Sequence, residues 1–305
     1  MGLKIGLIDV DGHNFPNLAL MKISAYHKAQ GDTVDWWNGW EQYDKVYMSK
    51  VFDDTYTPDV EEPYNTKELI KGGTDYSKTA VLPYEIEHMY PDYGLYPQYT
   101  QDTAYGYLTR GCPNQCGFCL VSEKEGCKTV QTANLNEWWH GQKNIVLMDA
   151  NLLACKTRFD LLRQLADSKA SVDVNQGFDA KLLTPGVIDL INDIKIKNIH
   201  FAWDLMRNSK AVLRGLEMYK AMATRKVSGG YGTVYVLTNY DTTMEQNLHR
   251  IYTLQDMGYD PYVMVYDKPN APKEIRDLQR WCNSVVIRKS CPDFADYKKE
   301  DSGDA

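Results

Sequence analysis

The chain has 305 residues, of which 43% are hydrophobic and 25% charged, a composition that excludes a largely disordered protein. Its formal net charge of -7 argues against a broad basic surface, so nucleic acid is not an expected partner. The first residues lack the charged and apolar regions of a signal peptide, and no apolar run reaches the roughly 18 residues of a membrane span. We therefore expect a cytoplasmic protein that does not enter a membrane.

The first 78 residues have the pattern of a Rossmann-type unit. An apolar run at Leu3–Val10 is followed by helical spacing at Asn17–Gln30, and short apolar runs at Thr33–Trp36 and Lys45–Met48 supply further strands. This order predicts a small doubly wound parallel sheet with helices on its faces. The next segment, 79–104, is rich in tyrosine and proline without a clean period, which predicts an ordered linker whose aromatic rings pack.

Residues 105–290 alternate short apolar strands with helical segments. Six runs have strand character: Tyr105–Thr109, Asn144–Met148, Ser171–Asn175, Asn198–Trp203, Thr233–Thr238 and Pro261–Val265. Four segments have the length and spacing of crossover helices: Thr157–Ser168, Pro185–Ile194, Lys210–Thr224 and Thr243–Gly258. The predicted fold class is therefore α/β, a Rossmann-like parallel sheet domain followed by a partial (β/α)6 barrel. We also expect a short strand at Val285–Ile287 and a C-terminal tail at 291–305 whose charged end is solvated.

Three of the seven cysteines, Cys112, Cys116 and Cys119, lie together in the sequence LTRGCPNQCGFCLV. An odd number of cysteines in a chain without an export signal indicates metal or thiol chemistry rather than a disulfide framework. The triplet follows a predicted strand, and in a parallel barrel the loops after strands line the face where ligands bind. Thiolates suit iron-sulfur clusters and zinc alike, so both metals stay open at this point. Three ligands indicate a centre with one open position.

The spacing CxxxCxxC, with Phe118 directly before the third cysteine, resembles the signature of radical S-adenosylmethionine (SAM) enzymes. The resemblance implies that the thiolates hold three irons of an oxygen-sensitive 4Fe-4S cluster, while the fourth iron takes the amino and carboxylate groups of SAM. It also implies that one electron, from a donor such as flavodoxin or ferredoxin, splits SAM into a 5'-deoxyadenosyl radical that abstracts a hydrogen atom from the substrate. Phe118 is then expected beside the cofactor.

Further segments resemble the parts of that family that hold SAM. The segment NIVLMDANLLA resembles the second barrel strand, which implies that Asp149 contacts the amino group of SAM, although an aspartate here also fits the N-cap of a turn. The segment SVDVNQGFDAKLLTP resembles the third strand and its loop. It implies that Gln176, Asp179 and Lys181 lie near the ribose or carboxylate of SAM, whose groups call for an acceptor or amide and a cation. Members often carry arginine in place of Lys181.

Later segments resemble the remaining barrel strands. IHFAWDL ends the fourth strand with Trp203 and Asp204, and Asn239 and Asp241 follow the fifth strand. Asn239 and Asp241 are expected at the same mouth of the barrel, whereas Trp203 is interpreted as a core aromatic residue.

The domain order is similar to the branch of the superfamily that carries a cobalamin-binding-like domain ahead of the barrel. The cobalamin ligand motif DxHxxG is missing, because the loop after the first strand reads Asp9, Val10, Asp11, Gly12, His13. We therefore expect no cobalamin, and we interpret His13 as a loop or domain-interface residue.

Two other functions stay open. Methylthio transfer to RNA is favoured by the similar domain order of that enzyme family, although this chain has no evident basic C-terminal domain for RNA. A non-enzymatic, zinc-stabilised binding module would use the same three thiols, with Cys127 or His140 as a fourth ligand.

Overall fold

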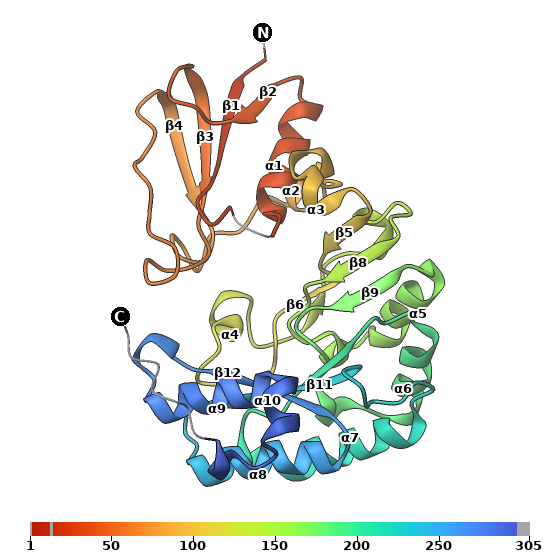
Figure 1. Cartoon of the computed structure of the whole chain (residues 1–305). Coiled ribbons are helices and arrows are strands. Elements are labelled where there is room, and N and C mark those ends of the chain that lie inside the picture. The colour runs from red at the N-terminus through yellow and green to blue at the C-terminus, as the bar shows by residue number, and fades with distance from the viewer. Residues whose placement is uncertain (1, 13–14, 298–305) are drawn as a thin grey trace. The chain divides into compact units, whose positions relative to one another are not determined.

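The computed structural model describes residues 2–12 and 15–297, which pack into two compact units (Figure 1). The first unit comprises residues 1–115 and 120–149, and the second comprises residues 116–119 and 150–305. His13 and the charged end of the tail, 298–305, lie outside the described residues. The domain boundaries expected after residues 78, 104 and 290 stay predictions.

The first unit begins with a four-stranded parallel sheet. Its strands are β1 (Lys4–Asp9), β2 (Thr33–Trp36), β3 (Tyr43–Ser49) and β4 (Thr66–Gly72), in the order β2-β1-β3-β4. Helix α1 (Leu18–Ala29) begins at Asn17, whose side chain accepts a hydrogen bond from Leu20 N. The helix packs Leu20 and Ile23 against Ile5 and Leu7 of β1. The predicted Rossmann-like sheet is confirmed.

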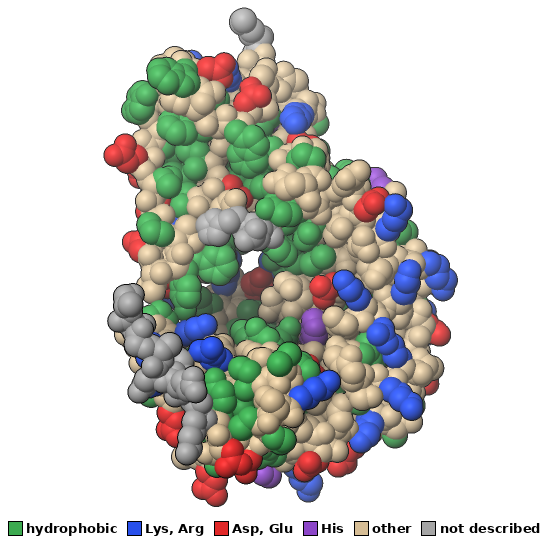
Figure 2. Space-filling model, viewed as in Figure 1, with side chains coloured by type: hydrophobic (Ala, Val, Ile, Leu, Met, Phe, Trp, Pro, Cys, Tyr) green, Lys and Arg blue, Asp and Glu red, His purple; other side chains and the backbone are tan. Residues whose placement is uncertain are grey.

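Two features of this sheet differ from the expectation. Strand β4, with the sequence TKELIKG, was not predicted, because it is a partly exposed edge strand without an apolar run. The connections 37–42 and 50–65, both fully described, contain no helix. The expected doubly wound arrangement is therefore wrong, since neither connection supplies a crossover helix. Figure 2 shows hydrophobic side chains gathered on the surface of this sheet, and the exposed residues in these connections include Phe52 and Tyr64.

The segment 79–104 is packed as expected and forms three short turns. These are α2 (Tyr84–Glu87), η1 (Tyr93–Leu95) and α3 (Pro97–Thr100). Ile86 joins the core cluster under α1, and Tyr96 is 4% exposed. The Tyr93 hydroxyl donates to the carbonyl of Trp138 at 2.6 Å. Tyr93 and Tyr96 thus pack their rings while their hydroxyls find acceptors, whereas Tyr84 is 77% exposed.

The six strands expected for the barrel all form. Strands β5 (Thr103–Gly106) and β8 (Asn144–Leu147) pair in parallel within the first unit. The second unit holds β9 (Ser171–Val174), β10 (Ile199–Ala202), β11 (Gly232–Thr238) and β12 (Asp260–Val265), and the last three form one parallel sheet. The predicted succession of a partial (β/α)6 barrel is confirmed.

The four expected crossover helices also form. They are α5 (Arg158–Ser168), α6 (Pro185–Asp193), α7 (Ser209–Met222) and α8 (Met244–Asp256). Thr184 caps α6 ahead of Pro185, and Thr243 and Gln246 form a reciprocal capping box at the start of α8. The sequence therefore places these helix starts through side chains that satisfy the first backbone N–H groups.

The C-terminal part contains α9 (Lys273–Asn283), α10 (Val285–Ser290) and η7 (Phe294–Asp296). The strand expected at Val285–Ile287 is wrong, because this run begins α10. The Ser284 side chain accepts a hydrogen bond from Ile287 N, which caps the helix, and Val286 is 78% exposed rather than inserted in a sheet. A local cap thus overrides the strand preference of three β-branched residues.

Short elements complete the chain: β6 (Thr109–Arg110), α4 (Val121–Lys124), β7 (Val130–Gln131), η2 (Leu135–Glu137), η3 (Leu152–Ala154), η4 (Ala180–Leu182), η5 (Met206–Asn208) and η6 (Lys268–Asn270). Across residues 2–12 and 15–297, no helix has both the length and the apolar character that a membrane crossing requires.

Candidate functional site

The cysteine loop begins directly after β6. Gly111 has a φ of 85°, and a Cβ there would lie 2.2 Å from the carbonyl oxygen of Lys128, so only glycine fits before the first cysteine. Gln115 also has a left-handed backbone, with a φ of 46°. Cys112 N donates to Gly126 O at 3.1 Å in the first unit. The loop therefore turns sharply within a few residues, as a loop that wraps a metal centre must.

The three thiols fit an iron-sulfur cluster by their chemistry. None of the seven cysteines, all of which belong to the described chain, forms a disulfide. Cys112 and Cys116 are partly exposed and Cys119 is exposed, so their sulfur atoms are not sealed in a core. Among the described residues, no group of three or more His, Cys, Asp or Glu is arranged to hold a metal ion. The fit thus rests on the donor set, because cysteine thiolates are the ligands that iron-sulfur clusters use.

The fourth ligand that a zinc site would need has other contacts. The His140 ring stacks on Tyr90 with centroids 4.0 Å apart, and its Nε2 lies 3.1 Å from the carbonyl oxygen of Asn136. Cys127 is exposed and its Sγ lies 3.9 Å from the carbonyl oxygen of Ser122. The imidazole of His140 is thus engaged locally, which argues against it as the fourth ligand of a zinc site.

Phe118 packs against a tyrosine that the sequence did not single out. Its ring contacts the ring of Tyr240 at a centroid distance of 5.2 Å, and Tyr240 in turn contacts Tyr266 at 5.1 Å. A Cβ on Gly117 would lie 2.4 Å from the Tyr240 hydroxyl, so the loop approaches this ring closely. Tyr240 follows Asn239, whose φ of 62° turns the chain after β11. The loop after β11 thus holds the segment between the second and third cysteines.

Asp149 lies at the end of β8 and is fully buried. Its carboxylate accepts hydrogen bonds from Leu108 N at 2.9 Å, Thr109 N at 2.6 Å and Thr109 Oγ1 at 2.5 Å. Burial raises the pKa of Asp149 to about 6, and the Thr109 and Leu108 donors oppose this rise. It does not cap the following turn, because η3 begins after Asn151. The side chain therefore fixes the backbone just ahead of the cysteine loop.

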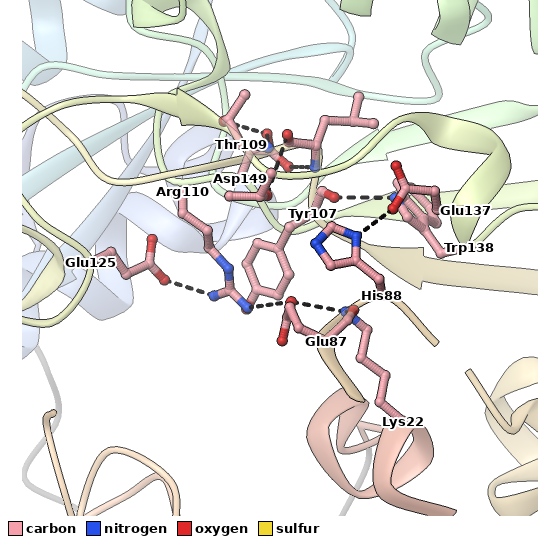
Figure 3. A network of polar contacts seen from close by, with 12 residues as sticks. Lys22, Glu87, His88, Tyr107, Thr109, Arg110, Glu125, Glu137, Trp138 and Asp149 are labelled. Carbon is pink, nitrogen blue, oxygen red and sulfur yellow. Dashed lines mark hydrogen bonds and ion pairs between the residues drawn. The ribbon is translucent and has the colours of Figure 1, made fainter. Parts of the chain in front are cut away.

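Arg110 is held between two carboxylates on the other side of the same backbone (Figure 3). Its Nη1 lies 2.8 Å from Glu125 Oε1 and its Nη2 lies 3.9 Å from Glu87 Oε1. The guanidinium carbon lies 3.3 Å from the ring centroid of Tyr107. Glu125 also accepts a hydrogen bond from Gly111 N at 3.0 Å. One carboxylate thus holds two successive residues directly before the first cysteine.

The network continues from Glu87 into α1. Lys22 Nζ lies 2.9 Å from Glu87 Oε1 and also donates to the Glu87 carbonyl oxygen. Burial lowers the pKa of Lys22, and the Glu87 carboxylate opposes this. Close by, His88 Nδ1 lies 2.7 Å from Glu137, and Trp138 Nε1 donates to the carbonyl of Tyr107 at 3.1 Å (Figure 3). None of these contacts has a signal in the sequence, because the partners are far apart along the chain.

Two of the predicted SAM-contacting residues meet in the second unit. Asp179 caps η4, accepting a hydrogen bond from Lys181 N at 3.1 Å, and its Oδ2 lies 3.5 Å from Lys181 Nζ. Asn151 Nδ2 donates to the same oxygen at 3.2 Å. Gln176 is exposed in the turn after β9 and makes none of these contacts. The ends of β9 and its loop therefore present an acceptor and a cation side by side.

Asp204, after β10, is a second carboxylate whose pKa the charges of Asp179 and Lys181 influence. It accepts a hydrogen bond from Leu237 N at 3.2 Å. Burial raises the pKa of Asp204 to about 6, while Arg250 and Lys181 lower it. Asn239 and Asp241 line a surface pocket with Thr242, Thr243 and Gln246.

Arg250 of α8 supports the same strand ends from the core. It is fully buried, and its guanidinium donates to the carbonyl oxygens of Trp203 at 2.7 Å, Asp204 at 2.8 Å and Leu237 at 2.8 Å, and to Asn247 Oδ1 at 2.6 Å. Trp203 is also fully buried, which confirms its interpretation as a core residue. This arginine could not be singled out from the sequence, because a helical Arg is normally exposed.

Comparisons with known proteins give a likeness in structure only. No family model matches the chain, and no curated protein matches its sequence. Its structure is similar to radical S-adenosylmethionine methyltransferase TsrM from Kitasatospora setae. In the structure of that enzyme with cobalamin and a 4Fe-4S cluster bound, the match covers 87% of this chain and 75% of the TsrM chain at 10% identity, with a TM-score of 0.62. In the structure with tryptophan substrate and the SAM analogue aza-SAM bound, the match covers 87% of this chain and 73% of the TsrM chain at 10% identity, with a TM-score of 0.61. This likeness shows the fold that the chain shares with that enzyme, a Rossmann-like parallel sheet followed by a partial α/β barrel.

Proposed function

We propose that the chain is a radical SAM enzyme, which cleaves SAM reductively at a 4Fe-4S cluster held by Cys112, Cys116 and Cys119 and so generates a 5'-deoxyadenosyl radical that modifies a substrate. The observation that carries this proposal is the cysteine triplet, which follows the first barrel strand in a chain with the fold of a radical SAM methyltransferase. When bound, the cluster supplies the electron and one open coordination position for SAM.

The residues of the chain have separate tasks in this proposal. Phe118, packed on Tyr240, shields the cofactor from solvent beside the third cysteine. Lys181 supplies a cation for the SAM carboxylate, and Asp179 and Gln176 supply an acceptor and an amide for the ribose. Asp149 was expected to contact the SAM amino group. Since Leu108 and Thr109 occupy its oxygens, we assign it to fixing the backbone ahead of the cluster loop.

The proposal includes no cobalamin, although the enzyme TsrM was solved with it. Two carboxylates in the loop that would carry the ligand motif have partners within the first unit. Asp9 accepts the Tyr96 hydroxyl at 2.6 Å, and Asp11 accepts hydrogen bonds from Phe52 N at 3.2 Å and from Val51 N. Gel filtration with hydroxocobalamin tests this point. We expect the cobalamin absorbance to elute apart from the protein, and co-elution at one equivalent would contradict it.

The reducing partner and the compartment follow from the chemistry. Cleavage of SAM needs one electron at low potential, so we propose a small flavodoxin or ferredoxin as donor. We also propose that the reaction takes place in the cytoplasm, where thiols stay reduced and available as ligands.

Anaerobic reconstitution with iron and sulfide tests the function. We expect broad absorbance near about 400 nm, typical of thiolate-bound clusters, and release of 5'-deoxyadenosine from SAM with dithionite. Cys116→Ala should abolish the absorbance, whereas Cys155→Ala should keep it, because Cys155 is buried beside Thr157. Equal iron content in both variants would refute the assignment of the ligands. Stoichiometric zinc without iron after anaerobic purification would favour the zinc-stabilised binding module.

A further inference from the structure

Helices cover one face of the sheet β10-β11-β12. The ring of Phe201 on β10 contacts the ring of Tyr219 on α7, with centroids 5.2 Å apart. Val263 on β12 is buried in a cluster with Ile251 of α8 and Trp281 of α9. Figure 1 shows α8 and α9 beside β12 in the second unit. Since side chains alternate along a strand, the neighbours of Phe201 and Val263 belong to the opposite face.

That opposite face carries a row of rings. His200 and Tyr235 have centroids 5.4 Å apart, and Tyr235 and Tyr262 have centroids 5.8 Å apart at an interplanar angle of 81°. In contrast to the buried residues of the helix-covered face, Tyr262 is 42% exposed and Met264 is 46% exposed. Exposed apolar side chains that gather on one face, rather than lying singly, mark interaction sites, so this row is a candidate binding surface.

Two polar groups beside this row lack a partner among residues 2–12 and 15–297. His200 Nδ1 is buried and makes no hydrogen bond. Asp173 lies on β9 with its side chain on the less buried side of the strand, opposite Val172 and Val174, and it makes no ion pair and no side-chain hydrogen bond. Its charge adds to the rise in the pKa of Tyr235 that burial causes. A buried ring nitrogen without a partner costs free energy, and a carboxylate beside apolar rings favours a positive charge. Both groups thus point to a bound molecule.

We propose that this face, defined by Asp173, His200, Tyr235, Tyr262 and Met264, binds the substrate, and that the substrate is an aromatic amine. Its ring packs on the Tyr235 and Tyr262 rings, its ammonium group faces Asp173, and a polar atom at the ring edge bonds His200 Nδ1. The inference rests on the proposed function in treating the bound molecule as the substrate. The assignment of the face itself depends only on the contacts of the second unit.

Four matched small molecules test this chemistry on the full chain, kept anaerobic and free of SAM. They are 2-phenylethylamine, its saturated analogue 2-cyclohexylethylamine, the neutral 2-phenylethanol and the anionic 3-phenylpropionate. Calorimetric or NMR titration gives each Kd. We expect 2-phenylethylamine to bind at least about fivefold more tightly than each of the other three, as loss of a ring-cation or charge contact predicts. Equal affinity for all four would overturn the proposal.

Variants locate the binding on this face. Tyr262→Leu should weaken 2-phenylethylamine at least about fivefold, while Tyr262→Phe keeps the ring and the affinity. Asp173→Asn should remove the preference over 2-phenylethanol, and Asp189→Asn, on the exposed side of α6, is its matched control and should change nothing. Unchanged affinities in Tyr262→Leu and Asp173→Asn would place the binding elsewhere and refute the proposal.

The outcome separates this inference from the proposed function. SAM cleavage without any preference among the four probes would refute the aromatic amine and leave the radical SAM chemistry standing. Selective binding of 2-phenylethylamine without SAM cleavage by the reconstituted protein would refute the enzyme and retain the binding face.

Discussion

Replacement of Arg250 by methionine tests whether the open ends of β10 and β11 depend on one buried cation. The substitution keeps an unbranched apolar chain of similar reach and removes every donor. It leaves the carbonyl oxygens of Trp203, Asp204 and Leu237 and the side chain of Asn247 without the guanidinium that now binds them. Because Arg250 is fully buried, water does not replace those bonds without opening the core.

The magnitude follows from two opposing terms. Hydrogen bonds to a charged group contribute about 1.5–3 kcal/mol each, so four of them contribute about 6 kcal/mol at the lower end of this range. Burial lowers the pKa of Arg250 to about 10, which corresponds to a cost of about 3 kcal/mol for holding the charge in the core. The expected net effect of Arg250→Met is a loss of at least about 3 kcal/mol in the free energy of unfolding, in line with the breaking of other buried charge contacts.

Urea unfolding and hydrogen exchange measure this effect. The midpoint of unfolding of the second unit should fall in Arg250→Met, and peptides that contain the ends of β10 and β11 should exchange faster than those of β12. The matched control is Arg280→Met on the exposed side of α9, which we expect to change stability by less than about 0.5 kcal/mol. A loss below about 1 kcal/mol in Arg250→Met, or the same loss in both variants, would refute the reasoning.

Three further predictions concern carboxylates. Glu125→Gln weakens the hydrogen bond from Gly111 N and should lower the iron content after reconstitution. The exposed neighbour Glu123 is the control, and Glu123→Gln should keep the iron content; equal iron content in the two variants would contradict this role of Glu125. Asp149→Asn sets an amide N–H against a backbone donor and should cost about 1–3 kcal/mol of stability, with faster exchange at residues 108–109 as the check and unchanged exchange as the contrary result. Burial raises the pKa of Asp204 to about 6, so the contribution of this carboxyl group to stability is full below about pH 4 and is lost as the pH rises through 6. Asp204→Asn should therefore flatten the dependence of the free energy of unfolding on pH between about 4 and 7. An unchanged slope would contradict the assignment.

The barrel was predictable because its local signals agree with its tertiary structure. Each strand from β9 to β12 is a short apolar run, and the helices between them start at residues such as Thr184 and Thr243 that cap them by side-chain hydrogen bonds. Local preference and long-range packing then point to the same element. Where they disagree, the prediction fails. The run Val285–Ile287 has the composition of a strand, but the cap at Ser284 and the exposure of Val286 make it helical.

The candidate site was predictable only in part, and the reason is chemical. Cys112, Cys116 and Cys119 lie within eight residues, so their spacing alone indicates a metal centre. The residues that hold the neighbouring backbone come from distant positions and bear common side chains. Glu125 and Asp149 are unremarkable in sequence until the fold sets one against Gly111 and the other against Thr109.

The contrast between local motifs and dispersed residues also explains why the sequence predicted a cofactor but no substrate. A cluster needs a fixed set of thiols, and that demand leaves a pattern along the chain. The substrate face that we propose takes its side chains from several strands, β9 to β12, at separate points between Asp173 and Met264. Each residue alone, such as Tyr262, has the ordinary features of a strand residue. Only their place on one face indicates the class of molecule that we propose binds there. On this face His200 Nδ1 is buried without a partner, and Asp173 is unpaired among residues 2–12 and 15–297.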